Sequence, residues 1–437
     1  TEEDALGIVT RHTYDMLGYP ATTTRDYTSG GVTGRNVVTV FTHDTKGRLL
    51  SERTEADGLV VETTNAYDIY GNLAARTDGN GNTTRYTYDA ANRLIAETNP
   101  AGETISLTYH LNGRIATIRY PDGSVTTYDY DDFGNRIAVH VDAYGLNLTT
   151  ESTYDLNGRL VGETDPEGAS TCYAWDAGDR LIGETRDCDG LALTTTYVHD
   201  AAGRMVSMSD ERGTVTRYEL DRLGQTLSVV LDEGGMDLTM TYGYDDAGNV
   251  ISATNERGAV TTYSYDALNR RLSTCRDAGG LNLCTTTTYD RLGYPLTETS
   301  PKGIVNRTEH NAFGLLARSI DDAGSLNAET TYAYDNAGNL VAITDANGNA
   351  TRYAYDGVDR QTHIFYADGT TVQTLYDAMG RTDARVDQAG VQVDHAYDGA
   401  GRLIAKTYPG GGSQIFTYDG AGRMLTANQT MDGHTTG

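Results

Sequence analysis

The fold is decided by residues 88–109, which read YDAANRLIAETNPAGETISLTY. Two runs of six residues, RLIAET and ETISLT, alternate with two short segments that are rich in Asp, Asn, Pro and Gly. Runs of this length bounded by turn-forming residues are typical of strands. The stretch therefore predicts a β-hairpin that is joined to its neighbours by tight turns.

The Tyr-Asp pair that opens this stretch recurs along the whole chain. About nineteen markers, each the Tyr of such a pair or its substitute, follow one another; after a first gap of 29 residues every spacing is 21 or 24. Between Tyr109 and Tyr334 the two spacings alternate strictly and give five units of 45 residues, whereas residues 1–42 form an irregular start. A fixed period indicates a repeat architecture, so we expect residues 1–437 to form a single array. The structural markers that keep Tyr from the fourth repeat onward are Tyr88, Tyr109, Tyr130, Tyr154, Tyr244, Tyr265, Tyr289, Tyr334, Tyr355, Tyr376, Tyr397 and Tyr418.

Turn chemistry fixes how the strands connect. The commoner first turn reads Asp-x-x-Gly, as in Asp155–Gly158, and the second turn can carry Pro, as in Asp165–Gly168. Both patterns are type I turn signatures, so the chain predicts an all-β fold of tandem antiparallel hairpins in one continuous sheet. About 38 strands at about 4.8 Å each give on the order of 180 Å of sheet. So wide a sheet must curl, and we expect it to spiral into a hollow shell or to stack as a solenoid-like rod.

Composition excludes several classes of partner. The chain carries 34 Lys and Arg against 61 Asp and Glu, a net charge of −27, which repels nucleic acid. No run of eighteen apolar residues occurs, so we expect no insertion into a membrane. Cys275 and Cys284 lie on the two arms of one predicted hairpin and are candidates for a disulfide. Cys172 and Cys188 lie in different arms, and their pairing is harder to justify.

Candidate catalytic and metal-binding residues are better explained by the repeat. His43, His199 and His310 stand where the marker Tyr stands elsewhere, so we interpret them as structural. The segments 78–82, DGNGN, and 345–349, DANGN, lack the bidentate Glu of a calcium loop and fall in corresponding turns. We therefore expect no catalytic residues, no cofactor and no metal site, and a scaffold in place of an enzyme.

The repeated consensus resembles that of the RHS/YD-repeat family. Residues 154–160, YDLNGRL, and residues 418–424, YDGAGRM, carry the motif, and the resemblance covers nearly the full chain. It implies a β strip that spirals into a cocoon. In bacterial Rhs proteins and toxin-complex proteins the cocoon encloses a C-terminal toxin, in teneurins a related barrel serves adhesion, and in wall-associated bacterial proteins it lies outside the cell.

The sequence departs from that family where the cocoon would close. A proline- and glycine-rich aspartyl self-cleavage motif and a following toxin domain have no counterpart here. We therefore expect either a section of a longer protein or an extended fibre. The first alternative predicts a shell wall that carries a polypeptide cargo. The second predicts an extracellular filament or adhesin, with neighbouring copies or cell-surface glycans as partners, and both place the protein outside the cytoplasm, secreted or at the cell surface.

Overall fold

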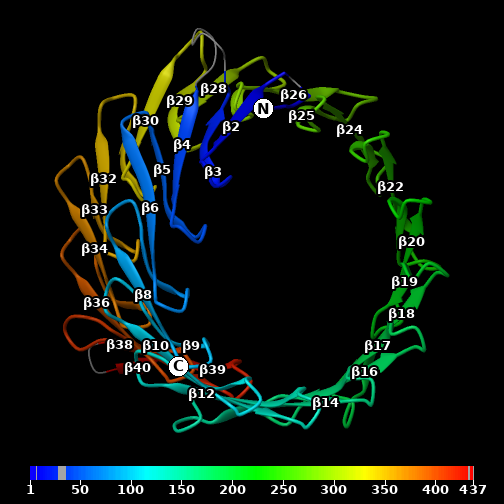
Figure 1. The fold of residues 1–437 in the computed structure, drawn as a ribbon. Helices are drawn as coiled ribbons and strands as arrows, with labels where there is room; N and C mark the ends of the chain where they lie inside the picture. The colour runs from blue at the N-terminus through cyan, green and yellow to red at the C-terminus, as the bar shows by residue number, and fades with distance from the viewer. Residues whose placement is uncertain (6, 28–35, 432–433, 437) are drawn as a thin grey trace. The chain divides into compact units, whose positions relative to one another are not determined.

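A computed structural model describes residues 1–5, 7–27, 36–431 and 434–436 (Figure 1). Forty strands and no helix occur in this part of the chain. Part of the predicted irregular start, residues 28–35, lies outside the described residues. No helix in the described ranges is long and apolar enough to span a membrane.

The strands are short and evenly distributed. Their bounds are β1 Glu2–Glu3, β2 Val9–Tyr14, β3 Pro20–Arg25, β4 Val37–His43, β5 Leu49–Ala56, β6 Leu59–Tyr67, β7 Leu73–Thr77, β8 Thr83–Tyr88, β9 Leu94–Thr98, β10 Thr104–Tyr109, β11 Ile115–Arg119, β12 Val125–Tyr130, β13 Arg136–Val141, β14 Leu148–Tyr154, β15 Leu160–Thr164, β16 Ser170–Trp175, β17 Leu181–Arg186, β18 Leu193–His199, β19 Met205–Ser209, β20 Val215–Leu220, β21 Thr226–Leu231, β22 Leu238–Tyr244, β23 Val250–Thr254, β24 Val260–Tyr265, β25 Arg271–Arg276, β26 Leu283–Tyr289, β27 Pro295–Thr299, β28 Val305–His310, β29 Leu316–Asp321, β30 Ala328–Tyr334, β31 Leu340–Thr344, β32 Ala350–Tyr355, β33 Gln361–Phe365, β34 Thr371–Tyr376, β35 Thr382–Val386, β36 Gln392–Tyr397, β37 Leu403–Thr407, β38 Ser413–Tyr418, β39 Met424–Met431 and β40 His434–Thr436.

Each strand pairs antiparallel with the strand that follows it in the chain. The pairings of β7 with β8, β8 with β9 and β9 with β10 show the pattern, which continues through the sheet. The predicted all-β fold of tandem antiparallel hairpins is therefore confirmed. Below, the turn that follows each marker is called the YD turn, and the turn at the opposite end of the strands is called the second turn.

The YD turn places one residue in the left-handed region of backbone space. In the turn after Tyr154, the amide of Gly158 donates to the carbonyl of Asp155 at 3.0 Å, and Gly158 has φ +78°. Tyr154 faces Leu160 whereas Thr153 faces Gly162, so the hairpin contains a one-residue bulge. This is a type I turn followed by a bulge, and it requires the glycine predicted at that position. Where Gly is absent the position is taken by Asn or Asp at φ 59–60°: Asn92, Asp179, Asn269 and Asp359.

The second turn has two lengths, which explains the spacings of 21 and 24. The short form, Asp165–Gly168, closes with a bond from the amide of Gly168 to the carbonyl of Asp165 at 2.9 Å. The long form, 277–282, begins and ends with left-handed residues, Asp277 at φ 52° and Asn282 at φ 50°. The three added residues therefore extend the edge of the strip without disturbing the register of the strands.

The sheet has two unlike faces and little interior. In β8, Tyr86 and Tyr88 are half-buried on one face, whereas Arg85 and Thr87 are exposed on the other. Only seven hydrophobic side chains of the described residues are buried, which are Val37, Val125, Ala138, Val229, Ala312, Val372 and Ala384. So thin a core cannot hold the strands in place alone, and polar contacts between repeats must contribute.

The chain divides into two compact units. Unit 1 contains residues 1–126, 288–417 and 424–437, and unit 2 contains residues 127–287 and 418–423. Within unit 1, the N-terminal strip that includes β6 and β8 runs beside the later strip that includes β32 and β34 (Figure 1). The number of domains expected from the sequence stays a prediction.

Candidate functional site: repeat locks and the seam between strips

The Asp of each Tyr-Asp pair organises its own turn. In the turn after Trp175, one carboxylate oxygen of Asp176 accepts from the amides of Gly178 at 2.8 Å and Arg180 at 3.1 Å. The other oxygen accepts from Nε of Arg180 at 2.6 Å. These bonds favour the ionised form and lower the pKa of Asp176 from 3.8 to about 2, with the side chain of Arg180 as the largest cause.

The Arg of the turn reaches forward to the next repeat. The guanidinium of Arg93 stacks on the ring of Tyr109 at 4.5 Å, and that of Arg381 stacks on Tyr397 at 4.6 Å. In other repeats the Nη1 atom of this Arg donates to the backbone carbonyl of the Asp in the next YD turn. Arg204 donates in this way to Asp221 at 2.7 Å. Cation–π contacts of this kind contribute about 0.5–1 kcal/mol each at exposed sites.

The marker ring reaches backward to the previous repeat. The hydroxyl of Tyr397 donates to the carbonyl of Thr382 at 3.0 Å, 15 residues earlier, and that of Tyr244 donates to Thr226 at 2.8 Å, 18 residues earlier. Trp175 makes the equivalent bond from its indole nitrogen to Leu160 at 2.7 Å. The bond spans 15 residues where the marker follows the previous one by 21 residues, and 18 residues where it follows by 24. We call the forward Arg contact and the backward ring contact together the repeat lock.

In two repeat locks both the Arg and the marker Tyr are replaced by other residues. Tyr294 stands where other turns carry Arg, and its ring lies 5.2 Å from that of His310, which replaces the marker Tyr. Tyr19 and His43 repeat the exchange at 5.4 Å. These contacts give His43 and His310 a structural partner.

A second set of contacts joins the two strips of unit 1, and we call this line the seam. Glu103 in a second turn of the early strip pairs with Arg360 in a YD turn of the late strip at 3.3 Å. Asp122 pairs likewise with Arg381 at 3.3 Å. The partners are 257 and 259 residues apart in the chain. A cavity of about 400 Å³ lies at this point of the seam and is lined in part by Glu103, Arg360 and Met379.

Further hydrogen bonds continue the seam along unit 1. Asp57 accepts from the amide of Ala312 at 2.6 Å, and Asn80 donates to Asp335 at 3.0 Å, both across 255 residues. Within unit 2 the same type of contact joins the second-turn residue Glu167 to the amide of Gly420 in a YD turn, across 253 residues. In each of these contacts a second turn of one strip lies against a YD turn of another.

Gly79 is a signal for the seam that the sequence contains. Gly79 is not among the residues with positive φ, yet a Cβ atom on it would lie 2.1 Å from the carbonyl oxygen of Asn336. A glycine without a conformational requirement indicates a close approach of another backbone. Sequence reasoning assigned this glycine to turn chemistry alone and missed the seam.

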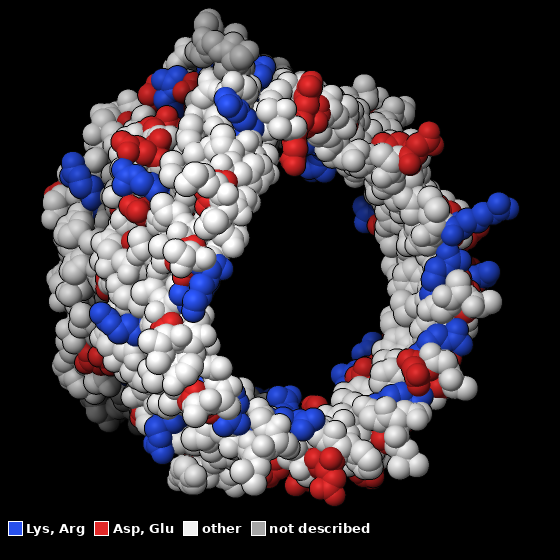
Figure 2. Space-filling view, viewed as in Figure 1, with Lys and Arg blue, Asp and Glu red and all other residues white. Residues whose placement is uncertain are grey.

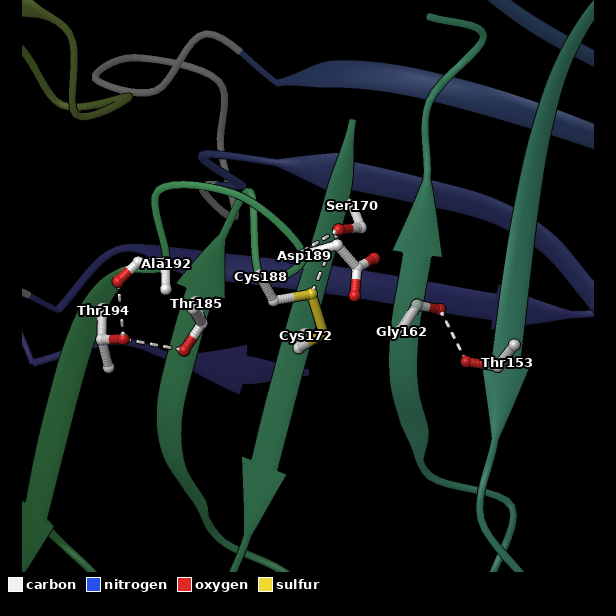
Figure 3. Close-up of a disulfide and its surroundings, with 9 residues drawn as sticks. All are labelled: Thr153, Gly162, Ser170, Cys172, Thr185, Cys188, Asp189, Ala192 and Thr194. Atoms are coloured by element: carbon white, nitrogen blue, oxygen red, sulfur yellow. Dashed lines mark hydrogen bonds between the residues drawn. A yellow bond between two sulfur atoms is a disulfide. The ribbon is translucent and has the colours of Figure 1, made fainter. Parts of the chain in front are cut away.

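The cysteines lie in pairs. Cys275 and Cys284 face each other directly on β25 and β26, and their sulfur atoms lie 2.11 Å apart. Their oxidation in the protein stays a prediction. The sulfur atoms of Cys172 and Cys188 lie 1.99 Å apart, although hairpin arms alone did not indicate this pair (Figure 3). The long turn after β17 folds back toward β16, where the amide of Cys188 donates to the carbonyl of Ser170 at 3.3 Å.

Clusters of charged side chains and of possible metal ligands are the remaining candidates for a functional site. Figure 2 shows acidic and basic side chains interspersed over the face in view. No group of three or more His, Cys, Asp or Glu suited to hold a metal ion occurs in the ranges that the structure describes. The repeat locks and the seam are thus the features on which a functional argument can be built.

Comparison with known proteins identifies the repeat. The Teneurin YD-shell family model matches residues 13–194, and the RHS Repeat model matches residues 199–235, 244–281, 310–350, 334–371 and 397–435. No curated protein sequence matches the chain.

Solved structures share the fold at low sequence identity. TcdB2-TccC3 without its hypervariable C-terminal region is 14% identical with a TM-score of 0.67, and 98% of this chain covers 27% of that one. The Photorhabdus luminescens Tc holotoxin pore is 15% identical with a TM-score of 0.53, and 97% of this chain covers 27% of that one. The present chain therefore spans about a quarter of the length of these structures. By its repeats, the chain belongs to the RHS/YD-repeat family.

Proposed function

We propose that the chain is a section of a shell wall that encloses and carries a polypeptide, and that it acts as a scaffold without catalysis. The observation that carries the proposal is the seam in unit 1, where Arg360 and Arg381 of one strip pair with Glu103 and Asp122 of another. A strip that docks on itself along its turns forms a continuous wall, whereas a single strip would leave both of its edges in water. The fold shared with Tc assemblies supports the same role.

Electron microscopy of the native particle tests this function. A closed body with internal density is expected, and mass spectrometry of the particle should identify the enclosed polypeptide. An open rod with a regular axial repeat would overturn the shell and support a fibre.

Protease protection tests whether the seam retains the cargo. The double variant Arg360→Ala and Arg381→Ala removes two seam ion pairs together with the ion pairs of these residues to Asp356 and Asp377 within their own turns. The matched control, Arg180→Ala and Arg204→Ala, removes two equivalent turn pairs from unit 2. After protease treatment we expect the cargo to be digested in the seam variant and protected in the control. Equal digestion in both would assign the effect to the ion pairs within the turns.

The fibre remains the second candidate, because one feature favours it. The long second turns carry an exposed apolar residue at 45-residue intervals, at Leu191, Met236 and Leu281. A regular row of this kind suits a repeating contact with neighbouring copies, and a fibre of this type could also contact cell-surface glycans.

Either role places the protein outside the cytoplasm or at the cell surface. The two cysteine pairs support an oxidising compartment, because disulfides persist there. Alkylation of the denatured native protein without reductant should label none of the four cysteines. Labelling of all four would argue for a reducing compartment.

A further inference from the structure

The cavity at the seam has apolar walls from both strips of unit 1. Ile105 and Pro121 of the early strip line it, and so do Val358 and Met379 of the late strip. Its volume of about 400 Å³ lies within the range of sites that hold small organic ligands, about 300–1,000 Å³. Such sites take their specificity from a few polar groups among apolar walls. The charged residues at this cavity therefore decide which ligand it can hold.

Two of these charged residues are already paired with protein groups. Arg360 donates from Nε to Asp356 at 2.7 Å and from Nη1 to Glu103 at 3.3 Å. Its guanidinium also lies 5.0 Å from the ring centre of Tyr376. The other carboxylate oxygen of Glu103 accepts from the side-chain amide of Asn99 at 2.5 Å. Arg360 is therefore engaged on several sides and is not available to an anionic ligand.

Glu97 is the third charged residue that lines the cavity, and it is in a different situation. It faces Ile105 across β9 and β10, and it lies half-buried on the same face of the sheet as Tyr86. In the part of the chain that the structure describes, no hydrogen bond or ion pair joins its carboxylate to another residue. A carboxylate that is partly removed from water is costly unless a cation pairs with it. The cavity thus combines apolar walls with one negative charge that no protein group offsets.

We infer that the seam cavity binds a primary ammonium group carried on a short apolar chain, with the Glu97 carboxylate as its counter-ion. The ammonium donates to Glu97, and the chain that carries it packs against the apolar walls, which include Ile105 and Met379. A free alkylamine and a lysine side chain share this chemistry. The inference rests on the cavity alone and does not depend on whether the wall encloses a cargo.

A ligand-observed NMR titration of the purified 437-residue chain with pentylamine at neutral pH tests the inference. We expect saturable binding with a Kd on the order of 1 mM, because a ligand with so few non-hydrogen atoms makes few contacts. Pentan-1-ol has the same apolar chain without the charge, and it should bind at least about tenfold more weakly. Equal binding of the amine and the alcohol would overturn the inference.

A second titration distinguishes the two sources of the ammonium group. N-acetyl-lysine N-methylamide presents a lysine side chain without a free amino terminus. If it competes with pentylamine, the cavity accepts a lysine side chain of a polypeptide. If pentylamine binds and the lysine derivative does not, the cavity is a site for free amines.

Substitution of Glu97 assigns the binding to this cavity. Glu97→Gln keeps the size of the side chain and removes its charge, so pentylamine should bind at least about tenfold more weakly. Glu97→Asp keeps the charge and should bind more tightly than Glu97→Gln. Thermal unfolding of each variant checks that it is folded.

Glu163→Gln is the matched control. Glu163 follows Tyr154 by nine residues, as Glu97 follows Tyr88, but it is exposed, lies in unit 2 and does not line this cavity. The net charge of −27 attracts amines to the whole surface, and the control measures this background because it loses the same single charge. The control should bind pentylamine as the wild type does. Equal affinities of the wild type, Glu97→Gln and Glu163→Gln would overturn the inference.

Discussion

The lock between Arg93 and Tyr109 and the lock between Tyr294 and His310 make the same connection with different side chains. In the first, a guanidinium lies 4.5 Å from the marker ring, and in the second a phenol ring lies 5.2 Å from an imidazole. Both pairs present a flat group from one turn to a ring in the next repeat. The rings of the second pair are tilted by 31°, so the difference teaches that more than one geometry connects the repeats when both partners change together.

The side chains at the Arg position also differ in how tightly they cover the next YD turn, as Tyr294 and Asn135 show. A Cβ atom on Gly314 would lie 2.6 Å from the hydroxyl of Tyr294, whereas one on Gly158 would lie 3.6 Å from Asn135. Both glycines have positive φ, +80° and +78°, so the conformational cost of a side chain is the same. Any difference between them therefore measures the packing of the lock.

The largest effect is expected for Gly314→Ala. The left-handed backbone should cost about 1 kcal/mol, and displacement of the Tyr294 ring about 2 kcal/mol more. Gly158→Ala should lose only the first amount. Urea denaturation of both variants measures the free energy of unfolding, and equal losses would show that the Tyr294 ring does not resist displacement.

A smaller effect should follow from restoring the common lock. His310→Tyr alone leaves two phenol rings facing each other and should destabilise the protein by about 1 kcal/mol. Tyr294→Arg alone gives the Arg and His combination that the chain already carries at Arg180 and His199, and it should cost less. The double variant recreates the Arg-Tyr pair, and we expect it to recover most of that loss.

The control for this exchange combines Tyr294→Arg with His199→Tyr. These residues belong to different units, so their effects should add. Additivity in the Tyr294 and His310 pair as well would show that the two substitutions are independent, and the lock would then not be a coupled unit.

The backward bond of the marker ring should contribute less. Tyr397→Phe removes the donor to the carbonyl of Thr382 and should cost about 1 kcal/mol. Tyr14, in the first repeat, is 62% exposed, and Tyr14→Phe should change the free energy of unfolding by less than about 0.5 kcal/mol. Thermal unfolding of the pair compares them directly. A loss for Tyr397→Phe as small as that expected for Tyr14→Phe would indicate that water replaces the hydroxyl bond without cost.

The sequence predicted what each repeat contains, and failed where distant repeats meet. The Tyr-Asp spacing and the turn residues were sufficient for the hairpins and for the left-handed Gly158, since these depend on neighbouring residues. The seam between Glu103 and Arg360 depends on how small rotations accumulate over many strands, and no single repeat encodes that sum. The Cys172 and Cys188 pair was not predicted for a related reason. The pairing depends on the path that a long turn follows in space, whereas the sequence indicated only the length of that turn.

Lowering the pH should weaken a YD turn that begins with Asp and leave a turn that begins with Asn unchanged. The change at a single turn should be smaller than the effects above. Asn311 accepts from the amides of Phe313 at 3.0 Å and Leu315 at 2.9 Å, as Asp176 does in its own turn, but an amide does not titrate. The pKa of Asp176 is lowered in the folded protein from 3.8 to about 2. Its stabilisation is therefore complete above pH 3.8 and is lost as the pH falls toward about 2.

Hydrogen exchange across that interval compares residues 176–180 with residues 311–315. The first segment should exchange progressively faster relative to its intrinsic rate, and the second should not. Asp176→Asn should abolish the pH dependence in the first segment, because it supplies the acceptor found at Asn311. If both segments opened together, acid would act on the whole strip through its summed charge, and the individual turn would not be the unit that carries the stability.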